Sequence, residues 1–138
     1  MIKKLKRTEL DIVLSIIEQN ELKACDGGSP DVDWIENFIV DNKCYALGYY
    51  HYNKLVSIIL AESLAMNGCI VWYIATDKQH QNNNFGTNLL KFFEKYVKEK
   101  FNVQWVFLNS TKESLNFYRK NEYITSEHSI VYEHVKNI

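Results

Sequence analysis

The chain has 138 residues, of which 46% are hydrophobic and 24% are charged, and its formal net charge is −1. This length predicts one domain over residues 1–138, and the apolar content predicts a packed globule. The near-neutral charge, without a basic stripe, argues against nucleic-acid binding. No run approaches the ~20 apolar residues that cross a bilayer, and the first residues lack a signal-peptide core. We therefore expect a soluble, cytoplasmic protein with no membrane partner.

The N-terminal part predicts one strand and two helices. A short strand is expected at residues 2–5, followed by a helix that Thr8 caps. The apolar residues of this helix share one face, namely Leu10, Val13, Leu14 and Ile17. Residues 27–30, Gly-Gly-Ser-Pro, interrupt regular secondary structure, and residues 31–40 predict a second helix.

Three strands are then predicted at residues 44–52, 55–63 and 70–76, with turns at residues 53–54 and 67–68, so they form a meander. A helix follows at residues 87–100. Its apolar stripe consists of Leu89, Leu90, Phe93 and Val97, and its expected solvent-side pairs are Glu94 with Lys98 and Lys95 with Glu99. A strand at residues 103–108, a helix within residues 111–123 and a strand at residues 129–134 complete the order.

Cysteine and histidine spacing predicts no metal site. The cysteines are odd in number and lack a CxxC pair, which favours reduced thiols: Cys25, Cys44 and Cys69. The histidines lack HExxH or similar ligand spacing, so a surface or packing role is expected for each: His51, His80, His128 and His134.

The loop between the strand at residues 70–76 and the helix at residues 87–100 predicts an anion site. The first N–H groups of a helix have no partner inside it and lie at the positive end of the macrodipole, so they bind phosphate oxygens. Gly86 has no Cβ, which lets a phosphate approach the backbone closely. Asn84 is a residue type that tolerates positive φ, as such a loop requires. A plain polar connection is the alternative explanation of this segment.

Two motifs in this order resemble the GNAT superfamily of N-acetyltransferases. Gln81-x-x-Asn84-x-Gly86 is similar to the family's acyl-CoA pyrophosphate loop, with Asn84 where glycine is usual. Residues 111–123 are similar to its later helix, with Phe117-Tyr118 as the strict match and Glu122 at the usual glycine position. An independent capping-box pattern, Ser110 with Glu113, predicts the start of this helix, and Asn121 is expected to end it in a left-handed conformation.

The resemblance covers nearly the whole chain and implies a fold and a co-substrate. The fold is α/β (α+β), with a mixed, mostly antiparallel sheet that splays between its two central strands and has helices on both faces. Acetyl-CoA would lie in the splay as a co-substrate. The implied cofactor-binding residues are Ile74, Ala75, Thr76, Gln81, Asn82, Asn83, Asn84, Phe85, Gly86, Thr87, Ser114 and Phe117.

Two residues are the implied catalytic candidates. Tyr118 matches the family tyrosine that protonates the departing thiolate, although a core tyrosine is the alternative. The strand at residues 70–76 carries no acid, so Glu62 near the end of the preceding strand is the first candidate for the base. A solvated strand-end carboxylate is the alternative for Glu62.

The resemblance thus implies an N-acetyltransferase that moves an acetyl group to a primary amine in a ternary complex. Acids gather between residues 24 and 42 without any lysine or arginine, and they favour a small cationic acceptor: Asp26, Asp31, Asp33, Glu36 and Asp41. Asp31 and Asp33 could equally stabilise a helix start. The alternatives to an enzyme are a non-catalytic acyl-CoA-binding or partner-binding domain and a structural dimer module that pairs through the C-terminal strand. The sequence leaves a homodimer open.

Overall fold

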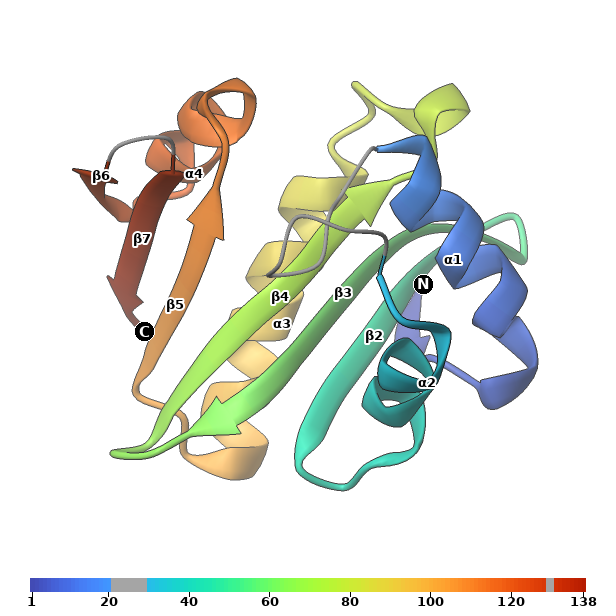
Figure 1. Cartoon of the computed structure of the whole chain (residues 1–138), viewed down its shortest axis with the longest axis horizontal. Coiled ribbons are helices and arrows are strands. Elements are labelled where there is room, and N and C mark those ends of the chain that lie inside the picture. The colour runs from blue at the N-terminus through green and yellow to red at the C-terminus, as the bar shows by residue number, and fades with distance from the viewer. Residues whose placement is uncertain (21–29, 129–130) are drawn as a thin grey trace.

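The computed structural model describes residues 1–20, 30–128 and 131–138 (Figure 1). The strands are β1 (Ile2–Lys4), β2 (Cys44–His51), β3 (Lys54–Leu64), β4 (Gly68–Thr76), β5 (Trp105–Ser110), β6 (Ile124–His128) and β7 (Val131–Asn137). The α-helices are α1 (Leu10–Gln19), α2 (Val32–Val40), α3 (Phe85–Phe101) and α4 (Leu115–Lys120). Single 3₁₀ turns are η1 (Arg7–Glu9), η2 (Lys78–His80) and η3 (Lys112–Ser114). The predicted interruption between the first two helices, at residues 27–30, lies almost wholly outside the described residues. Cys25 and Asp26 lie outside them too.

The strands form one mixed sheet in the order β1-β2-β3-β4-β5-β7-β6. Among the described strands only the β4–β5 pair is parallel, because α3 crosses between these strands, while the other pairs are antiparallel. Helices α1 and α2 cover one face and α3 covers the other (Figure 1). The mostly antiparallel sheet with helices on both faces agrees with the predicted fold class.

Amphipathic faces of the helices build the two cores. The predicted stripe of α3 is completely buried at Leu89, Leu90, Phe93 and Val97. On α1 the buried residues are Val13, Ile16 and Ile17, so the core-facing stripe runs slightly differently from the predicted one. Burial of side chains of this size contributes roughly 1.5–3 kcal/mol each before the entropy cost of ordering the chain.

A bulge in β4 opens the sheet at its centre. Tyr73 pairs with Leu60 and Val71 pairs with Ala61, which leaves Trp72 as an extra residue without its own partner on β3. Pairing between β4 and β5 ends at Val71 with Leu108, so residues 72–76 of β4 have no β5 partner. A bulge bends and twists its strand. The predicted splay is therefore present between β4 and β5, and Figure 1 shows the two strands diverging.

The C-terminal part departs from the prediction. The single strand expected at residues 129–134 is the second half of a hairpin, β6 and β7, and residues 129–130 lie outside the described residues. β7 lies between β5 and β6, so it is not an edge strand. The proposed pairing of a dimer through the C-terminal strand is therefore wrong in this form.

The predicted helix ends also need correction. Thr8 lies within η1 and makes no cap hydrogen bond, and α1 begins only at Leu10. The Ser110–Glu113 capping box is absent, because the Ser110 hydroxyl bonds elsewhere and the chain enters α4 through η3. Asn121 has φ of −90°, whereas Glu122 has φ of 70°. The left-handed residue is thus the one at the family's glycine position.

One expected surface pair is buried instead. Glu94 is 9% exposed, accepts a hydrogen bond from the Tyr123 hydroxyl at 2.8 Å and pairs with the Lys136 ammonium at 2.9 Å. It therefore does not form the predicted solvent-side pair with Lys98. The Lys95–Glu99 pair is exposed, as predicted, at 4.0 Å.

Candidate functional site

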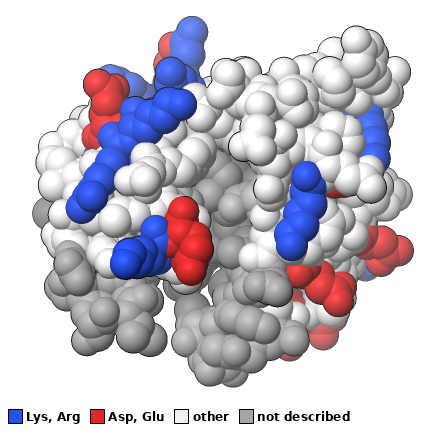
Figure 2. All heavy atoms as spheres, turned by 90° about the horizontal axis from the view of Figure 1, so that it is seen from above, with Lys and Arg blue, Asp and Glu red and all other residues white. Residues whose placement is uncertain are grey.

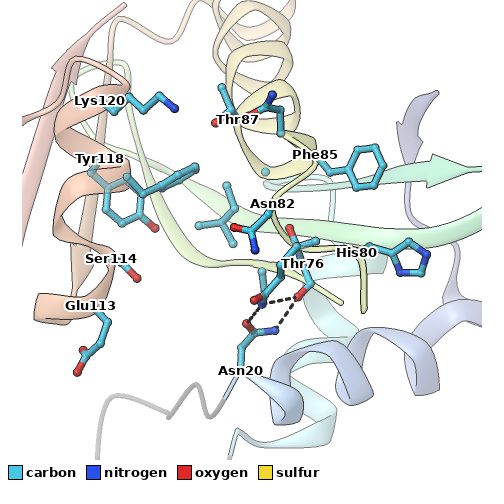
Figure 3. A pocket seen from close by; sticks show the side chains of 16 residues that line it. Asn20, Thr76, His80, Asn82, Phe85, Thr87, Glu113, Ser114, Tyr118 and Lys120 are labelled. Atoms are coloured by element: carbon cyan, nitrogen blue, oxygen red, sulfur yellow. Dashed lines mark hydrogen bonds between the residues drawn. The ribbon is translucent and has the colours of Figure 1, made fainter. Parts of the chain in front are cut away.

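The splay holds a cavity of about 460 Å³, open toward the carboxyl end of β4 (Figure 3). One wall is the loop that leads into α3, and the other is α4 with the turn before it. The lining residues are Asn20, Ile74, Ala75, Thr76, His80, Gln81, Asn82, Asn84, Phe85, Gly86, Thr87, Glu113, Ser114, Phe117, Tyr118 and Lys120. Figure 2 views the molecule from above, the side of this cavity, and shows both basic and acidic side chains there.

The α3 side of the cavity has the backbone of an anion site. Asn82 and Asn84 have φ of 67° and 62°, so both adopt the left-handed conformation, as expected for Asn84. Asn84 is the N-cap residue, and its side chain makes no cap hydrogen bond. The first N–H group bonded inside the helix is that of Asn88, to the Asn84 carbonyl at 2.9 Å. The N–H groups of residues 85–87 therefore have no partner among the described residues, and they lie at the positive end of α3.

Gly86 belongs to the lining of the cavity on the α3 side. A Cβ added there would lie 3.5 Å from Thr76 Oγ1 and 3.8 Å from the Phe117 ring. These are ordinary van der Waals distances, so the folded chain itself does not require glycine at this position. A side chain at residue 86 would, however, extend into the gap between β4 and α4. The space beside Gly86 is therefore open to a ligand and is not needed for packing within the described part of the chain.

A hydrogen-bond network closes the floor of the cavity beside β4. The Thr76 carbonyl accepts from Asn20 Nδ2 at 3.0 Å and from Gln81 Nε2 at 3.3 Å, and Gln81 also donates to Asn20 Oδ1 at 3.1 Å. The Thr76 hydroxyl lies 2.8 Å from Ser57 Oγ. The end of α1, the end of β4 and the loop before α3 are thereby joined through side-chain amides (Figure 3).

Tyr118 forms part of the opposite wall. Its side chain is 6% exposed, and its hydroxyl points into the cavity (Figure 3). The hydroxyl has no hydrogen-bond partner among the described residues, and burial raises the pKa of Tyr118 above its ordinary value. The group therefore stays protonated around neutral pH and is free to donate a hydrogen bond into the cavity.

Glu62 is not brought together with Tyr118. It lies on β3 opposite Ile70, outside the lining of the cavity, and its Oε1 accepts from Trp72 Nε1 at 2.9 Å. Burial raises the pKa of the nearby Cys44 thiol to about 11, with smaller contributions from Asp41 and Glu62. Glu62 and Asp41 thus form a small acidic region near the start of β2.

The acidic segment has structural uses that the structure now defines. The Asp31 side chain accepts from the Trp34 N–H at 3.0 Å, which confirms that it caps α2. Glu36 pairs with Arg7 at 3.5 Å, and Asp41 accepts from the Lys43 N–H at 2.8 Å.

The site residues predicted from the sequence and the residues that line the cavity agree closely but not completely. Asn83 was expected in the loop contacts, yet it is not among the lining residues, and its Nδ2 donates to the His80 and Gln81 carbonyls. Four lining residues were missed: Asn20, His80, Glu113 and Lys120. Lys120 could have been found, because it follows Phe117 by one helical turn, whereas Asn20 is brought in only by the tertiary fold.

The comparisons with known proteins agree on one fold. The acetyltransferase (GNAT) family model matches residues 13–123, whereas no curated protein matches the chain. PaiA N-acetyltransferase from Thermoplasma acidophilum, solved in complex with coenzyme A, is 17% identical with a TM-score of 0.85, covering 100% of this chain and 98% of that one. An aminoglycoside 6'-N-acetyltransferase complexed with coenzyme A is 13% identical with a TM-score of 0.82 (99% and 96% covered). Spermidine N-acetyltransferase SpeG from Vibrio cholerae is 14% identical with a TM-score of 0.79 (99% and 94% covered).

Proposed function

The chain belongs to the GNAT acetyltransferase family, and we propose that it transfers an acetyl group from acetyl-CoA to the primary amine of a small cationic molecule. Residues 1–138 act in this proposal as one acetyltransferase domain. The observation that carries it is the cavity in the splay, which has on one wall helix N–H groups that are unpaired among the described residues and on the other the Tyr118 hydroxyl. Two of the structural relatives were solved with coenzyme A.

The cavity offers complementary groups for acetyl-CoA. The N–H groups of residues 85–87 would bind the pyrophosphate, and Gly86 would allow it to approach the backbone. Lys120 adds a cationic side chain to the lining. Asn84 and Glu122 replace family glycines, but both have the positive φ that those positions need. These departures from the family pattern therefore do not by themselves support a loss of activity.

The reaction is a direct attack in a ternary complex. The amine nitrogen attacks the thioester carbonyl carbon, the carbon–sulfur bond breaks, and the coenzyme A thiolate leaves. Tyr118 donates a hydrogen bond, and finally its proton, to that thiolate, and the resulting tyrosinate takes a proton back from solvent. A thiol pKa of about 8.5 lies well below that of a phenol, so the hydrogen bond stabilises the leaving group before the proton moves.

The amine must lose a proton before or during attack, and Glu62 is the proposed acceptor of that proton. Because Glu62 lies outside the cavity lining, the proton would reach it through water. Glu62 Oε1 accepts a hydrogen bond from Trp72 Nε1, and Glu62 Oε2 has no partner among the described residues.

A cationic acceptor is supported by the acidic residues near α2 and β2, which create a negative local potential. Two of the structural relatives are an aminoglycoside 6'-N-acetyltransferase and a spermidine N-acetyltransferase, and both of these named acceptors are amines.

In the described part of the chain no helix is long and apolar enough to cross a membrane. A cytoplasmic location remains part of the proposal, and the free thiols of Cys44 and Cys69 support it.

The proposal is tested by a thiol-release assay with acetyl-CoA against polyamines, aminoglycosides, amino acids and peptides. We expect turnover with at least one small cationic amine. Acetyl-CoA binding without turnover on any acceptor would favour the non-catalytic alternative, and a peptide-only activity would refute the small-molecule assignment.

A further inference from the structure

A buried histidine lies directly behind Tyr118. His134 on β7 has no solvent exposure, and both of its ring nitrogens are hydrogen-bonded. Its Nε2 lies 2.6 Å from Ser110 Oγ on β5, and its Nδ1 lies 3.0 Å from Thr125 Oγ1 on β6. The two hydroxyls come from the strands on either side of β7, so the imidazole is held at both ends.

The register of the sheet fixes this arrangement. Thr125 is the direct cross-strand partner of His134, whereas Ser110 is paired with Tyr132 and so lies diagonally from the ring. A hydroxyl can donate or accept, so either tautomer of the neutral imidazole is fully satisfied. Burial, and to a smaller extent the nearby Arg119 charge, lower the pKa of His134 and keep the ring neutral.

The Tyr118 ring packs against the ring of His134. The centroids of the two rings are 4.6 Å apart, with planes inclined by 36°. Helix α4 has only six residues, and Tyr118 contacts Phe117 and Tyr123 at 5.0 and 6.0 Å between centroids. The His134 contact is the closest of these three. The hydroxyl itself has no partner among the described residues, so packing of the ring has to set its direction.

From this geometry we infer that His134 is a positioning residue, held by Ser110 and Thr125, that orients the Tyr118 ring so that the hydroxyl meets the leaving thiolate. The inference rests on the proposed role of Tyr118. His134 lies outside the lining of the cavity and acts only through the tyrosine.

The competing explanation is that His134 merely fills the core. A core-filling residue would affect folding and all steps alike, whereas a positioning residue affects kcat through the Tyr118 hydroxyl alone. The two explanations therefore differ in whether the effect of a His134 substitution survives once that hydroxyl is removed.

The test is a double-mutant cycle with His134→Leu, Tyr118→Phe and the double variant. We expect His134→Leu to lower kcat by about 10-fold, as a small misplacement of a reacting group does, with the affinity for acetyl-CoA unchanged. In the Tyr118→Phe background the same substitution should change kcat by less than about 2-fold, because the hydroxyl it positions is absent.

The controls separate orientation from stability. Thr125→Val removes one hydrogen bond to His134 while keeping the side-chain shape. If His134→Leu does not fold, Thr125→Val takes its place in the cycle and should lower kcat only when the Tyr118 hydroxyl is present. Val106→Ala truncates a fully buried side chain on β5 and should lower the melting temperature while keeping kcat.

An equal loss of kcat in both backgrounds would refute the positioning role and leave the proposed function intact. A Tyr118→Phe variant with full kcat would refute the role of the tyrosine and the inference together.

Discussion

The buried pair of Glu94 and Lys136 gives the sharpest prediction for stability. Lys136 Nζ donates to Glu94 Oε1 at 2.9 Å and to the Asn121 carbonyl at 3.0 Å, and the Tyr123 hydroxyl donates to Glu94 Oε2. This cluster joins α3 to the segment after α4, and therefore joins the two walls of the cavity. Lys136→Met keeps most of the side-chain volume and leaves the carboxylate without its cation.

The magnitude follows from burial. Removing one member of a buried pair costs about 3–5 kcal/mol, and the 19% and 11% exposed side chains here favour the lower value. At roughly 3 °C per kcal/mol for a chain of this size, a loss of about 3 kcal/mol lowers the melting temperature by about 10 °C.

Thermal unfolding measured by circular dichroism checks this value. Lys95→Met is the matched control, because Lys95 pairs with Glu99 at 4.0 Å with both side chains largely exposed. Its expected cost is below about 1 kcal/mol. A melting temperature of Lys136→Met within about 2 °C of that of Lys95→Met would refute the assignment of the cluster as a buried, energetically important pair.

Three further predictions concern the chemistry. Tyr118→Phe keeps the ring, so kcat should fall on the order of 10²-fold with little change in acetyl-CoA affinity, and parallel loss of binding and stability would identify a structural tyrosine instead. If acids near α2 attract the acceptor, its KM should rise with added salt, since charges more than ~8 Å apart are screened at physiological ionic strength; a KM that is independent of salt would remove this support. Because burial raises the pKa of Cys44 to about 11, only about 10⁻³ of it is thiolate at pH 8. Site-resolved mass spectrometry should show slow alkylation that accelerates toward pH 11, and rapid labelling at pH 8 would contradict the burial.

The local sequence pattern predicted the structure correctly where the structure depends only on residues that are close together in the chain. The apolar stripe of α3 buries Leu89 and Phe93 as its periodicity requires, and Asn84 takes the left-handed conformation that its side chain tolerates. The loop and its helix were predictable for the same reason, because an anion site at a helix start is made by residues adjacent in sequence.

The sequence pattern failed to predict features that depend on residues far away in the chain. Glu94 has the spacing of a surface pair with Lys98, but its partner Lys136 lies 42 positions away. β6 is a short edge strand with several polar residues, so it lacks the alternation that marks a half-buried strand. Glu122 ends the helix region with a positive φ although Asn121 is the better residue type for it, which shows that the geometry of the turn outweighs local preference there.

We expect acetyl-CoA to bind in the splay with its pyrophosphate at the start of α3, and calorimetric titration of three proteins tests this placement directly. Gly86→Asp places a carboxylate in the cavity wall, whereas Asn88→Asp adds the same charge in the first turn of α3 on an exposed residue outside the lining. We expect wild type and Asn88→Asp to bind acetyl-CoA with similar Kd, and Gly86→Asp to bind at least about 10-fold more weakly while remaining folded, because a like charge opposes the phosphates at short range. A folded Gly86→Asp variant that binds as tightly as wild type would contradict the placement of the pyrophosphate and with it the proposed site.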